Sequence, residues 1–439
     1  MAEALRLGIA GLGTVGGGVL DILARHGQLV AARAGRPVEI TAVSARSRAK
    51  DRGHDLSRLA WHEDPLALAA DPGIDVFIEL IGGEGGPAKA AVETALRHGK
   101  HVITANKALI AQHGNEIFAA ASARGVSVAF EAAVGGGIPI IKAIREGLAA
   151  NHIEWVAGII NGTGNYILSE MRERGRSFAA ALAEAQALGY AEADPTFDVE
   201  GIDAAHKLAI LASLAFGIPL QFERIYCEGI SGLSSEDIRY AEELGYRIKH
   251  LGICRRTASG IELRVHPTLI PDDRLIANVN GVMNAILVRG DAVGPTLYYG
   301  PGAGSEPTAS SVVADIVDVA RTLTADPEHR VPHLAFQADR LSSEPVLPIE
   351  SVRTSYYLRV TVLDQPGVLW RIAQILSDAG ISIEALIQKE APEDQDTATM
   401  ILLTSVTEER SMNEAIRAIE AQDATRGPVR RIRMEKLDG

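Results

Sequence analysis

The stretch LRLGIAGLGTVG, residues 5–16, decides the fold of this chain. Residues 5–10 have the apolar pattern of a buried strand, and a helical pattern continues from Gly16 to residue 23. Between them Gly11 permits a tight turn, Gly13 lets the backbone approach a pyrophosphate, and Gly16 allows close packing of helix on strand. The free N–H groups at the start of the helix then face the anion. The stretch predicts a dinucleotide-binding βαβ unit, with a purely structural glycine turn as the alternative.

The first third of the chain repeats this alternation of short strands and longer helices. Apolar, β-branched segments are typical of strands, and Ala-rich segments with apolar residues at helical spacing separate them. The strand segments are 38–44, 75–81, 101–104 and 126–132, and the helical segments include 88–98 and 115–124. This order predicts an α/β domain with a doubly wound parallel sheet, a Rossmann fold, over residues 1–135.

Two further domains are expected after residue 135. Residues 136–324 mix helical and strand-like segments and predict an α+β domain, whose last helix, 304–324, we expect to return to the first domain. Residues 325–351 are typical of a linker, with little periodicity and with prolines at 327, 332, 345 and 348. Residues 352–439 have the order strand, helix, strand, strand, helix, strand, which predicts a ferredoxin-like βαββαβ domain.

The composition is that of a globular protein with several domains. A length of 439 residues suggests about three domains of about 150 residues each. The formal charge of -13 disfavours a general nucleic-acid binder and attachment to anionic membranes. No apolar stretch reaches the roughly 18 residues of a membrane span, so we expect a cytoplasmic protein. Cys227 and Cys254 are too few for a disulfide framework, and we expect both thiols to be buried.

The residues after the second strand indicate which dinucleotide is bound. An acidic residue there accepts from the ribose 2′-OH of NAD, whereas arginine pairs with the 2′-phosphate of NADP. No acid stands at the end of the 38–44 segment, and Arg46 and Arg48 follow it. We therefore expect NADPH to be the preferred cofactor, with NAD as the alternative cofactor and a solvated basic loop as the alternative interpretation.

Side chains that can carry chemistry follow the later strands. Ligands of such sheets lie beyond the carboxyl ends of the strands, where Thr104 is followed by Lys107, although a surface lysine is the alternative. Glu131 ends the fifth strand and precedes a glycine-rich turn whose carbonyl groups can converge. Asp203 and Lys207 are four residues apart and share one helix face, a spacing that by itself is also typical of a solvated ion pair.

Five motifs connect these residues with a known family. GLGTVGGGV, TANKALI, EAAVGGGIPI, NGTGNYIL and GYAEADPTFDVEGIDAAHKLAIL occur in this order along the chain. Together they closely resemble homoserine dehydrogenase over about residues 5–324. The C-terminal βαββαβ unit, with its LDQPGVL turn, resembles an ACT domain, a regulatory module that often binds an amino acid. The resemblance implies an enzyme that interconverts L-homoserine and L-aspartate 4-semialdehyde with a nicotinamide cofactor, in threonine and methionine biosynthesis.

The resemblance also implies roles for single residues. Lys207 matches the lysine assigned to proton transfer, Asp203 matches its neighbouring carboxylate, and Lys107 matches a second active-site lysine near the nicotinamide. Glu192 and Asp198 match acidic residues that engage the substrate amino group or shape its pocket. The implied cofactor-binding residues are Gly11, Gly13, Thr14, Val15, Gly16, Arg46, Arg48, Thr104, Lys107 and Gly302.

The resemblance also implies a bound cation and an amino-acid effector. Glu131 with the carbonyl groups of Val134, Gly136 and Ile138 matches the monovalent-cation site of the family, usually a sodium site. Threonine, as a pathway end product, is the expected effector of the ACT unit, whose alternative role is self-association alone. We expect a homodimer or homotetramer.

Two other functions remain open at this point. Another Rossmann semialdehyde or hydroxyacid dehydrogenase is one, although neither cysteine stands at a strand end and no strand-end histidine is paired with a carboxylate. A non-catalytic sensor of NADP(H) and an amino acid is the other, and it would not need the lysines and acids together.

Overall fold

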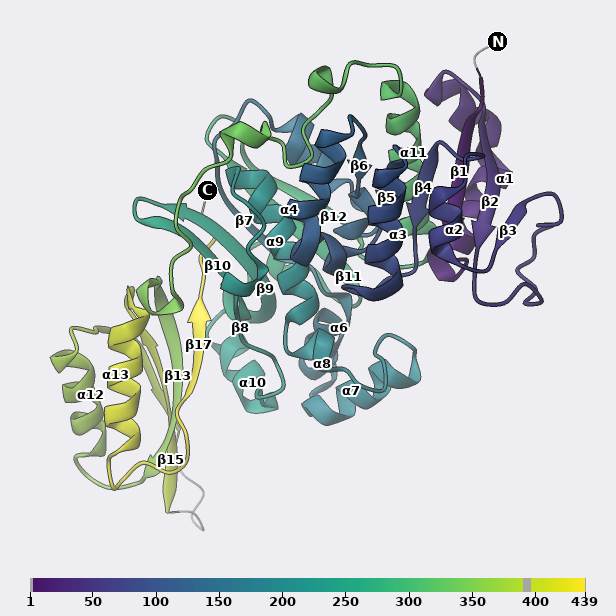
Figure 1. Cartoon of the computed structure of the whole chain (residues 1–439). Helices are drawn as coiled ribbons and strands as arrows, with labels where there is room; N and C mark the ends of the chain where they lie inside the picture. The colour runs from purple at the N-terminus through teal and green to yellow at the C-terminus, as the bar shows by residue number, and fades with distance from the viewer. Residues whose placement is uncertain (1–2, 390–395, 439) are drawn as a thin grey trace. The chain divides into compact units, whose positions relative to one another are not determined.

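The computed structural model describes residues 3–389 and 396–438 (Figure 1). Contacts divide the chain into two compact units. Unit 1 comprises Met1–Gly162, Asp203–Ile225 and Val282–Glu344, and unit 2 comprises Thr163–Ile202, Tyr226–Gly281 and Pro345–Gly439. The expected domain ranges 1–135 and 352–439 include residues 1–2, 390–395 and 439, which lie outside the described residues. The boundaries of the three expected domains stay predictions.

Unit 1 contains the predicted Rossmann sheet. Its strands, in spatial order, are β3 (Ala60–His62), β2 (Val38–Ser44), β1 (Leu5–Ala10), β4 (Val76–Glu79), β5 (His101–Thr104) and β6 (Val128–Ala129). All neighbouring pairs are parallel, so their carboxyl ends meet at one edge. The register places Ser44, Ala10, Glu79 and Thr104 in one row across that edge. The loops that follow these residues therefore start side by side.

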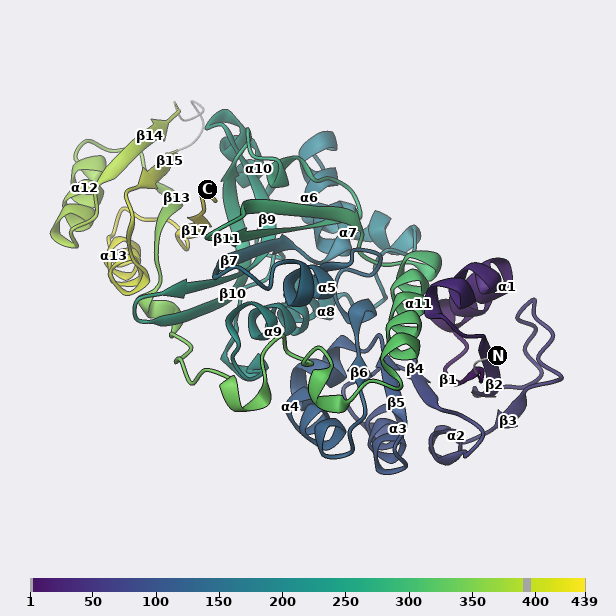
Figure 2. The same cartoon turned by 90° about the horizontal axis from the view of Figure 1, so that it is seen from above.

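Helices cover both faces of this sheet, which confirms the doubly wound α/β fold. Figure 2 shows α1 (Thr14–Ala34) and α11 (Ser305–Thr322) on one side, and α2 (Pro65–Ala70), α3 (Gly86–Arg97) and α4 (Lys107–Ala123) on the other. Helix α11 returns from the far end of unit 1 and packs on α1 around Gly18, where a Cβ would fall 2.7 Å from Ser305 Oγ. The apolar residues of α1, α11 and the strands form one core.

Helix α4 begins eight residues before the segment that the sequence indicates. Its N-cap is Asn106, whose side-chain oxygen accepts a hydrogen bond from the Leu109 N–H at 3.1 Å. This cap fixes the start of the helix at Lys107, directly after the carboxyl end of β5.

The rest of unit 1 consists of an antiparallel sheet and a buried helix. The sheet has the order β12 (Gly294–Pro301), β11 (Met283–Gly290) and β7 (Ile153–Ile159). The expected helix at 139–149 is a short α5 (Ile140–Lys142) continued by a π-helical turn (Ala143–Gly147). Every residue of α9 (Ile202–Phe216) after the first is buried. A helix that is apolar on all sides belongs in a protein interior.

Unit 2 is built on one long mixed sheet. Its order is β9 (Tyr246–Thr257), β10 (Gly260–Pro271), β17 (Arg430–Met434), β13 (Arg353–Leu363), β15 (Thr397–Thr404) and β14 (Ile383–Gln388), with β8 (Tyr226–Cys227) beside β10 and β16 (Thr407–Glu408) beside β13. The helices are α6 (Gly162–Arg174), α7 (Phe178–Ala187), α8 (Thr196–Val199), α10 (Ser235–Glu243), α12 (Val368–Asp378) and α13 (Glu409–Glu420). Cys254 is buried as expected, but the expectation is wrong for Cys227, which is exposed at the end of β8. Among the described helices, none is both long and apolar enough to cross a membrane.

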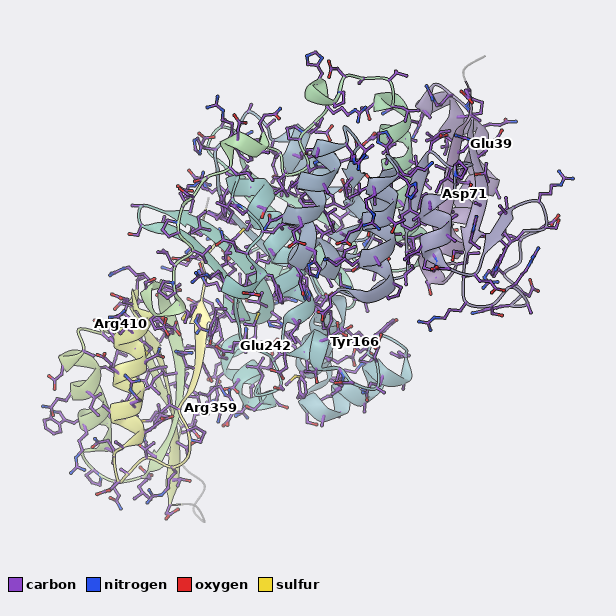
Figure 3. All side chains as sticks on the ribbon, viewed as in Figure 1. Glu39, Asp71, Tyr166, Glu242, Arg359 and Arg410 are labelled. Atoms are coloured by element: carbon purple, nitrogen blue, oxygen red, sulfur yellow. The ribbon has the colours of Figure 1, made fainter. Side chains whose placement is uncertain are left out.

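The C-terminal βαββαβ unit has the predicted order β13, α12, β14, β15, α13, β17. Both of its helices cover the same face of its strands (Figures 1 and 2). On the other face Arg359 donates from Nε to Asp237 of α10 at 2.7 Å, and Figure 3 labels Arg359 on β13 and Arg410 on α13. Strand β17 also runs parallel to β10, with Arg433 opposite Thr268. The ferredoxin-like unit is thus joined to the rest of unit 2 by both a face and an edge of its sheet.

Buried ion pairs accompany this junction. Arg433 is fully buried and donates to both carboxylate oxygens of Glu409, at 2.5 and 2.8 Å, and to Glu228 at 2.7 Å. Arg431 and the Tyr356 hydroxyl also contact Glu409, at 2.7 and 2.8 Å. Since a buried charge that loses its partner is costly, these contacts make the position of α13 depend on one carboxylate.

We predict that Glu409→Gln lowers the stability of unit 2 by about 3 kcal/mol, because it removes one of the two carboxylates that pair with the buried Arg433 and the carboxylate nearest to the partly buried Arg431. Thermal and urea unfolding of the full chain measure the change. Glu414→Gln, an exposed carboxylate on the same helix, is the matched control. Equal stability of the two variants would contradict the role given to Glu409.

Candidate active site

The glycine loop between β1 and α1 has the geometry that a pyrophosphate needs. Gly11 has φ +99°, and a Cβ there would lie 2.4 Å from the Leu80 carbonyl oxygen. A Cβ at Gly16 would lie 2.1 Å from the carbonyl oxygen of Gly11, whereas nothing lies within 4 Å of a Cβ at Gly13. Two of the three glycines are therefore required by the protein's own packing, and Gly13, which is exposed, leaves the backbone open. The loop fits a dinucleotide, whose phosphates the N–H groups of Thr14 and Val15 would meet.

A buried carboxylate organises the loop after β4. Glu79 is fully buried and accepts hydrogen bonds from the N–H groups of Ile81 and Gly82, at 2.7 and 2.9 Å. It also accepts from the Thr104 hydroxyl at 2.6 Å, and Thr104 Oγ1 in turn accepts from the Asn106 N–H at 3.0 Å. These hydrogen bonds fix the end of β4 relative to the end of β5, after which Lys107 begins α4.

The two expected phosphate-binding arginines lie beyond the carboxyl end of β2. Arg46 and Arg48 are exposed and follow Ser44, which stands in the row of strand ends next to Ala10. The guanidinium carbon of Arg48 lies 6.0 Å from the centre of the Trp61 ring. Both arginines therefore lie on the β2 side of the glycine loop, where the adenosine end of a dinucleotide binds in this fold.

Three residues from distant parts of the sequence meet around one carboxylate. Asp203 Oδ1 lies 3.0 Å from the Lys107 Nζ, and Asp203 Oδ2 lies 2.6 Å from the Lys207 Nζ. The Asn161 side-chain amide donates to the same Oδ2 at 2.9 Å, and Lys207 also donates to the carbonyl oxygen of Ile160 at 2.7 Å. The i,i+4 pair of α9 is therefore buried in the protein and is not a solvated ion pair.

The charges in this cluster keep Asp203 ionised. Burial by itself would raise the pKa of Asp203, but the charges of Lys207 and Lys107 and the hydrogen bonds from Lys207 and Asn161 hold that pKa well below its ordinary value. Two ammonium groups share one carboxylate, so the cluster as a whole is positive. Lys107 keeps 36% of its side chain exposed, compared with 10% for Lys207. Of the two lysines in this cationic cluster, Lys107 is thus the more accessible to solvent.

A neutral histidine borders the cluster. His206 precedes Lys207 on α9, stacks on Phe222 with ring centres 4.2 Å apart, and lies 3.5 Å from the Gln112 side-chain nitrogen. Burial lowers the pKa of His206, the Asp203 charge opposes this effect, and the Lys107 charge adds to it. The site therefore does not gain a further positive charge from this ring at neutral pH.

The glycine turn at Gly302 packs against the side-chain amide of Asn284. A Cβ at Gly302 would lie 2.0 Å from the side-chain nitrogen of Asn284, and a Cβ at Gly136 would lie 2.5 Å from the carbonyl oxygen of Gly302. Asn284 is 99% buried, and both atoms of its amide lack a hydrogen-bond partner among the described residues. A buried amide without partners is costly to the protein, so this turn fits a bound polar group such as a carboxamide.

The turn that is expected to hold a cation starts at a buried carboxylate, and its carbonyl oxygens of Gly136 and Ile138 accept hydrogen bonds from the Ser311 hydroxyl and the Ile140 N–H, at 2.6 and 2.8 Å. Glu131 begins a 3-10 helix (Glu131–Ala133), is buried, and accepts hydrogen bonds from the N–H groups of Ile141 and Lys142 at 2.9 Å each. Burial and the charge of Asp315 raise the pKa of Glu131 to about 7, while Lys142 lowers it. The described residues contain no group of three or more metal-ligating side chains. The carbonyl oxygens and single carboxylate fit an alkali ion better than a transition metal.

The structure does not bring all the expected site residues into one unit. Glu192 is exposed and Asp198 is partly buried in α8, and both belong to unit 2. All the other expected site residues belong to unit 1. The backbone carbonyl of Glu192 accepts a hydrogen bond from the Gln186 side chain at 3.0 Å, and the residue is exposed to solvent.

Sequence reasoning missed several residues of the site. Glu79 was not identified, although a carboxylate at the end of a buried parallel strand is itself a signal of function. Asn161 opens the NGTGN motif and could have been selected with it. His206 and Asn284 stand in apolar segments, where a single polar residue in an otherwise buried pattern is the signal.

Models of known protein families match most of the chain. A model described as the NAD binding domain of homoserine dehydrogenase matches residues 11–131, and a homoserine dehydrogenase model matches residues 139–317. An ACT domain model matches residues 356–424. These three matches follow the order of the sequence motifs and of the C-terminal βαββαβ unit.

Whole proteins of the same kind are similar over nearly the full length. A homoserine dehydrogenase of Pseudomonas aeruginosa is 63% identical over 434 residues, which cover 99% of both chains. One of Neisseria gonorrhoeae is 56% identical over 433 residues, again 99% of both chains. The crystal structure of a homoserine dehydrogenase from Thiobacillus denitrificans superposes with a TM-score of 0.95 at 61% identity and covers 99% of both chains.

We predict that Asp203→Asn lowers the pKa of Lys107 and Lys207, because two neighbouring ammonium groups then lose the carboxylate between them. Carbon NMR of protein labelled with ¹³C at lysine Cε follows both titrations. The Cε resonance of Lys142, whose partners Asp315 and Asp318 stay in place, should have the same chemical shift in both proteins and serves as the control. Unaltered titration of Lys207 would show that Asp203 does not govern its charge.

Proposed function

The chain belongs to the homoserine dehydrogenase family, and from that premise we propose that it interconverts L-homoserine and L-aspartate 4-semialdehyde through the cluster of Lys107, Asp203 and Lys207. The observation that carries the proposal is the single buried carboxylate between two lysines, at the carboxyl edge of a dinucleotide-binding sheet. The family match favours this enzyme over another Rossmann dehydrogenase. A sensor without catalysis would not require this cluster.

Proton transfer follows from the charge that develops during the reaction. A nicotinamide held by the glycine loop and Gly302 would supply hydride-transfer chemistry at the aldehyde carbon, and the electron pair of the carbonyl bond would then move to oxygen. The Lys207 ammonium then donates a proton to that oxygen, and the positive cluster stabilises the charge before transfer is complete. In the reverse direction neutral lysine removes the hydroxyl proton. Asp203 takes no proton; it holds the two lysines and keeps Lys207 cationic.

Substrate recognition requires opposite charges at the two ends of an amino acid. We propose that Glu192 and Asp198 recognise the substrate ammonium group, as the family resemblance implies. The substrate carboxylate needs donors, which Lys107 and the N–H groups at the start of α6, residues 162–164, can supply. The exposed carboxylate of Glu192 supports this assignment.

The cofactor is a nicotinamide dinucleotide, and we propose that NADPH is preferred over NADH. Gly11, Gly13 and Gly16 hold the pyrophosphate, while Gly302 and the amide of Asn284 fit the carboxamide end. Arg46 and Arg48 follow β2 with no acidic residue at the strand end, which supports pairing with a 2′-phosphate.

A sodium ion at the Glu131 turn is a separate proposal. Glu131 with the carbonyl groups of Val134, Gly136 and Ile138 would hold it, and the positive charge would favour ionised Glu131. The ion would fix the glycine turns and take no part in hydride transfer. Activity that is unchanged after sodium is replaced by tetramethylammonium would contradict this proposal.

We propose that threonine binds the ACT unit near residues 364–367 and inhibits the enzyme. We propose that the domains are residues 1–135, 136–324 and 352–439, and that residues 325–351 form the linker before the last domain. We also propose a homodimer or homotetramer in the cytoplasm. Calorimetric titration with threonine that gives neither heat nor inhibition would leave the ACT unit a role in self-association.

Lys207→Ala should lower kcat by about 10²–10⁴-fold while NADPH binding stays nearly unchanged, because only proton transfer and oxyanion stabilisation are lost. Consumption of NADPH with aspartate semialdehyde measures turnover, and fluorescence titration measures binding. Lys89→Ala, which removes the lysine of another i,i+4 pair on α3, is the control. If Lys207→Ala keeps most of the wild-type kcat, Lys207 is only the partner of Asp203 in a structural ion pair.

The double variant Arg46→Ala/Arg48→Ala should raise KM for NADPH by about tenfold or more and leave KM for NADH unchanged, because only NADPH carries the 2′-phosphate. Steady-state kinetics with both cofactors measures the effect. Arg58→Ala, an exposed arginine in the same loop, should change neither value. Parallel changes for both cofactors would contradict recognition of the phosphate.

A further inference from the structure

The proline-bearing segment after α11 is docked on unit 1. The ring nitrogen Nε2 of His333 accepts a hydrogen bond from the Val128 N–H at 3.0 Å, and the ring stacks on Phe118 with centres 5.0 Å apart. Further on, the Ser342 N–H donates to the carbonyl oxygen of Gly217 at 2.6 Å. Figure 2 shows this green segment passing β6 and α4. The first half of the expected linker is therefore part of the wall of unit 1.

A cavity of about 750 Å³ lies between this segment and α4. Helix α4 contributes Asn115, Phe118, Ala119 and Ser122, which share one helix face, and the docked segment contributes Phe336 and Leu341 among others. The volume falls within the range of small-molecule sites, about 300–1,000 Å³. The lining residues of α4 stand about 12–22 Å along the helix from Lys107. The cavity is separate from the lysine cluster.

One arginine of the cavity wall has unused donors. Arg330 Nη1 donates to the Gly125 carbonyl oxygen at 2.8 Å and to the Ser127 hydroxyl at 3.5 Å, and Nη2 donates to the Ala325 carbonyl oxygen at 3.0 Å. A guanidinium has five N–H donors, so Nε–H and one N–H of Nη2 lack an acceptor. Among the described residues, Nε is buried without a partner, and no carboxylate lies within ion-pair distance of Arg330.

The same edge of another arginine in unit 1 binds a carboxylate. Arg6 donates from Nε to Asp75 Oδ2 at 3.1 Å and from Nη2 to Asp75 Oδ1 at 2.6 Å. This two-point geometry is the one that guanidinium and carboxylate groups prefer. Arg330 lines the cavity, and its equivalent Nε–H and one N–H of Nη2 have no such partner among the described residues. Burial lowers the pKa of Arg330, and the charge of Asp326 only partly opposes this effect.

We propose that this cavity is a binding site for a small carboxylate with an aromatic or branched apolar body, held through the Nε and Nη2 edge of Arg330. Phe118, Phe336 and the neighbouring prolines receive the apolar body. Asp339 also lines the cavity, but it is exposed and lies 3.5 Å from the Arg340 guanidinium. The carboxylate class therefore follows from charge complementarity with Arg330.

Calorimetric titration of the full chain with 4-phenylbutyrate and with uncharged 4-phenylbutanamide tests the proposal. We expect the acid to bind about tenfold more tightly than the amide, because only the acid forms charge-assisted hydrogen bonds. Arg330→Gln should remove this difference by weakening the acid alone. Arg330→Lys, which keeps the charge without the two-point edge, should give an intermediate affinity. Arg340→Gln is the matched control and should change nothing.

Blocking the cavity gives an independent result. Ala119 is exposed on α4, so Ala119→Trp fills the cavity without disturbing the core and should abolish binding of both probes. The proposal is overturned if the wild type binds neither probe, if acid and amide bind equally, or if Arg330→Gln keeps the difference. It is also overturned if neither probe binds and Ala119→Trp changes the mass of the assembly in light scattering, since the groove would then be an interface between copies. Because calorimetry measures binding and not turnover, the result does not depend on the proposed enzyme activity.

Discussion

The cluster of Lys107, Asp203 and Lys207 depends on the buried carboxylate of Asp203. Removing a carboxylate from water costs several kcal/mol, and a partner at 4 Å returns about 4 kcal/mol at an effective dielectric constant of 20. Two lysines, at 2.6 and 3.0 Å, and the Asn161 amide, at 2.9 Å, together offset this cost and keep Asp203 ionised. The same carboxylate therefore needs α4 and α9 together. Their meeting leaves one positive charge in excess, which suits a reaction that creates an oxyanion.

The Rossmann sheet provides the frame in which these helices can meet. Ala10, Glu79 and Thr104 stand in one row, so the glycine loop, the loop after β4 and the start of α4 begin at the same edge. Neighbouring strands are about 4.8 Å apart, which puts the ends of β1 and β5 about 10 Å from each other. Glu79 fixes the loop between them through three hydrogen bonds. The glycine loop and Lys107 thus follow strand ends that lie close together at one edge of the sheet.

Much of this could be predicted from sequence because the signals are local. The segments 5–10, 38–44 and 101–104 agree with β1, β2 and β5 residue by residue, since each is a short apolar run that ends at a turn. The three-residue β3 and six-residue α2 were missed, because elements so short carry no period. The start of α4 was placed too late because its cap, Asn106, lies inside a motif that was interpreted for chemistry.

The burial of the Asp203–Lys207 pair required tertiary structure, because the spacing alone fits a surface pair equally well. A stronger signal was present in the helix itself, since IDAAHKLAILASLAF is apolar on every side, and charges in such a helix need partners. Asn284 and Arg330 could not be identified from sequence at all. Each has N–H donors without an acceptor among the described residues, and no sequence pattern indicates that a partner is missing.

The docked segment contacts the two helices that carry the lysine cluster, α4 and α9, at their far ends. His333 stacks on Phe118 of α4, and Ser342 is hydrogen-bonded to Gly217, which directly follows α9. Gly217 stands ten residues after Lys207, about 15 Å along the helix axis. The segment between α11 and the ferredoxin-like unit therefore contacts both helices that carry the lysine cluster, each at the end opposite to the cluster.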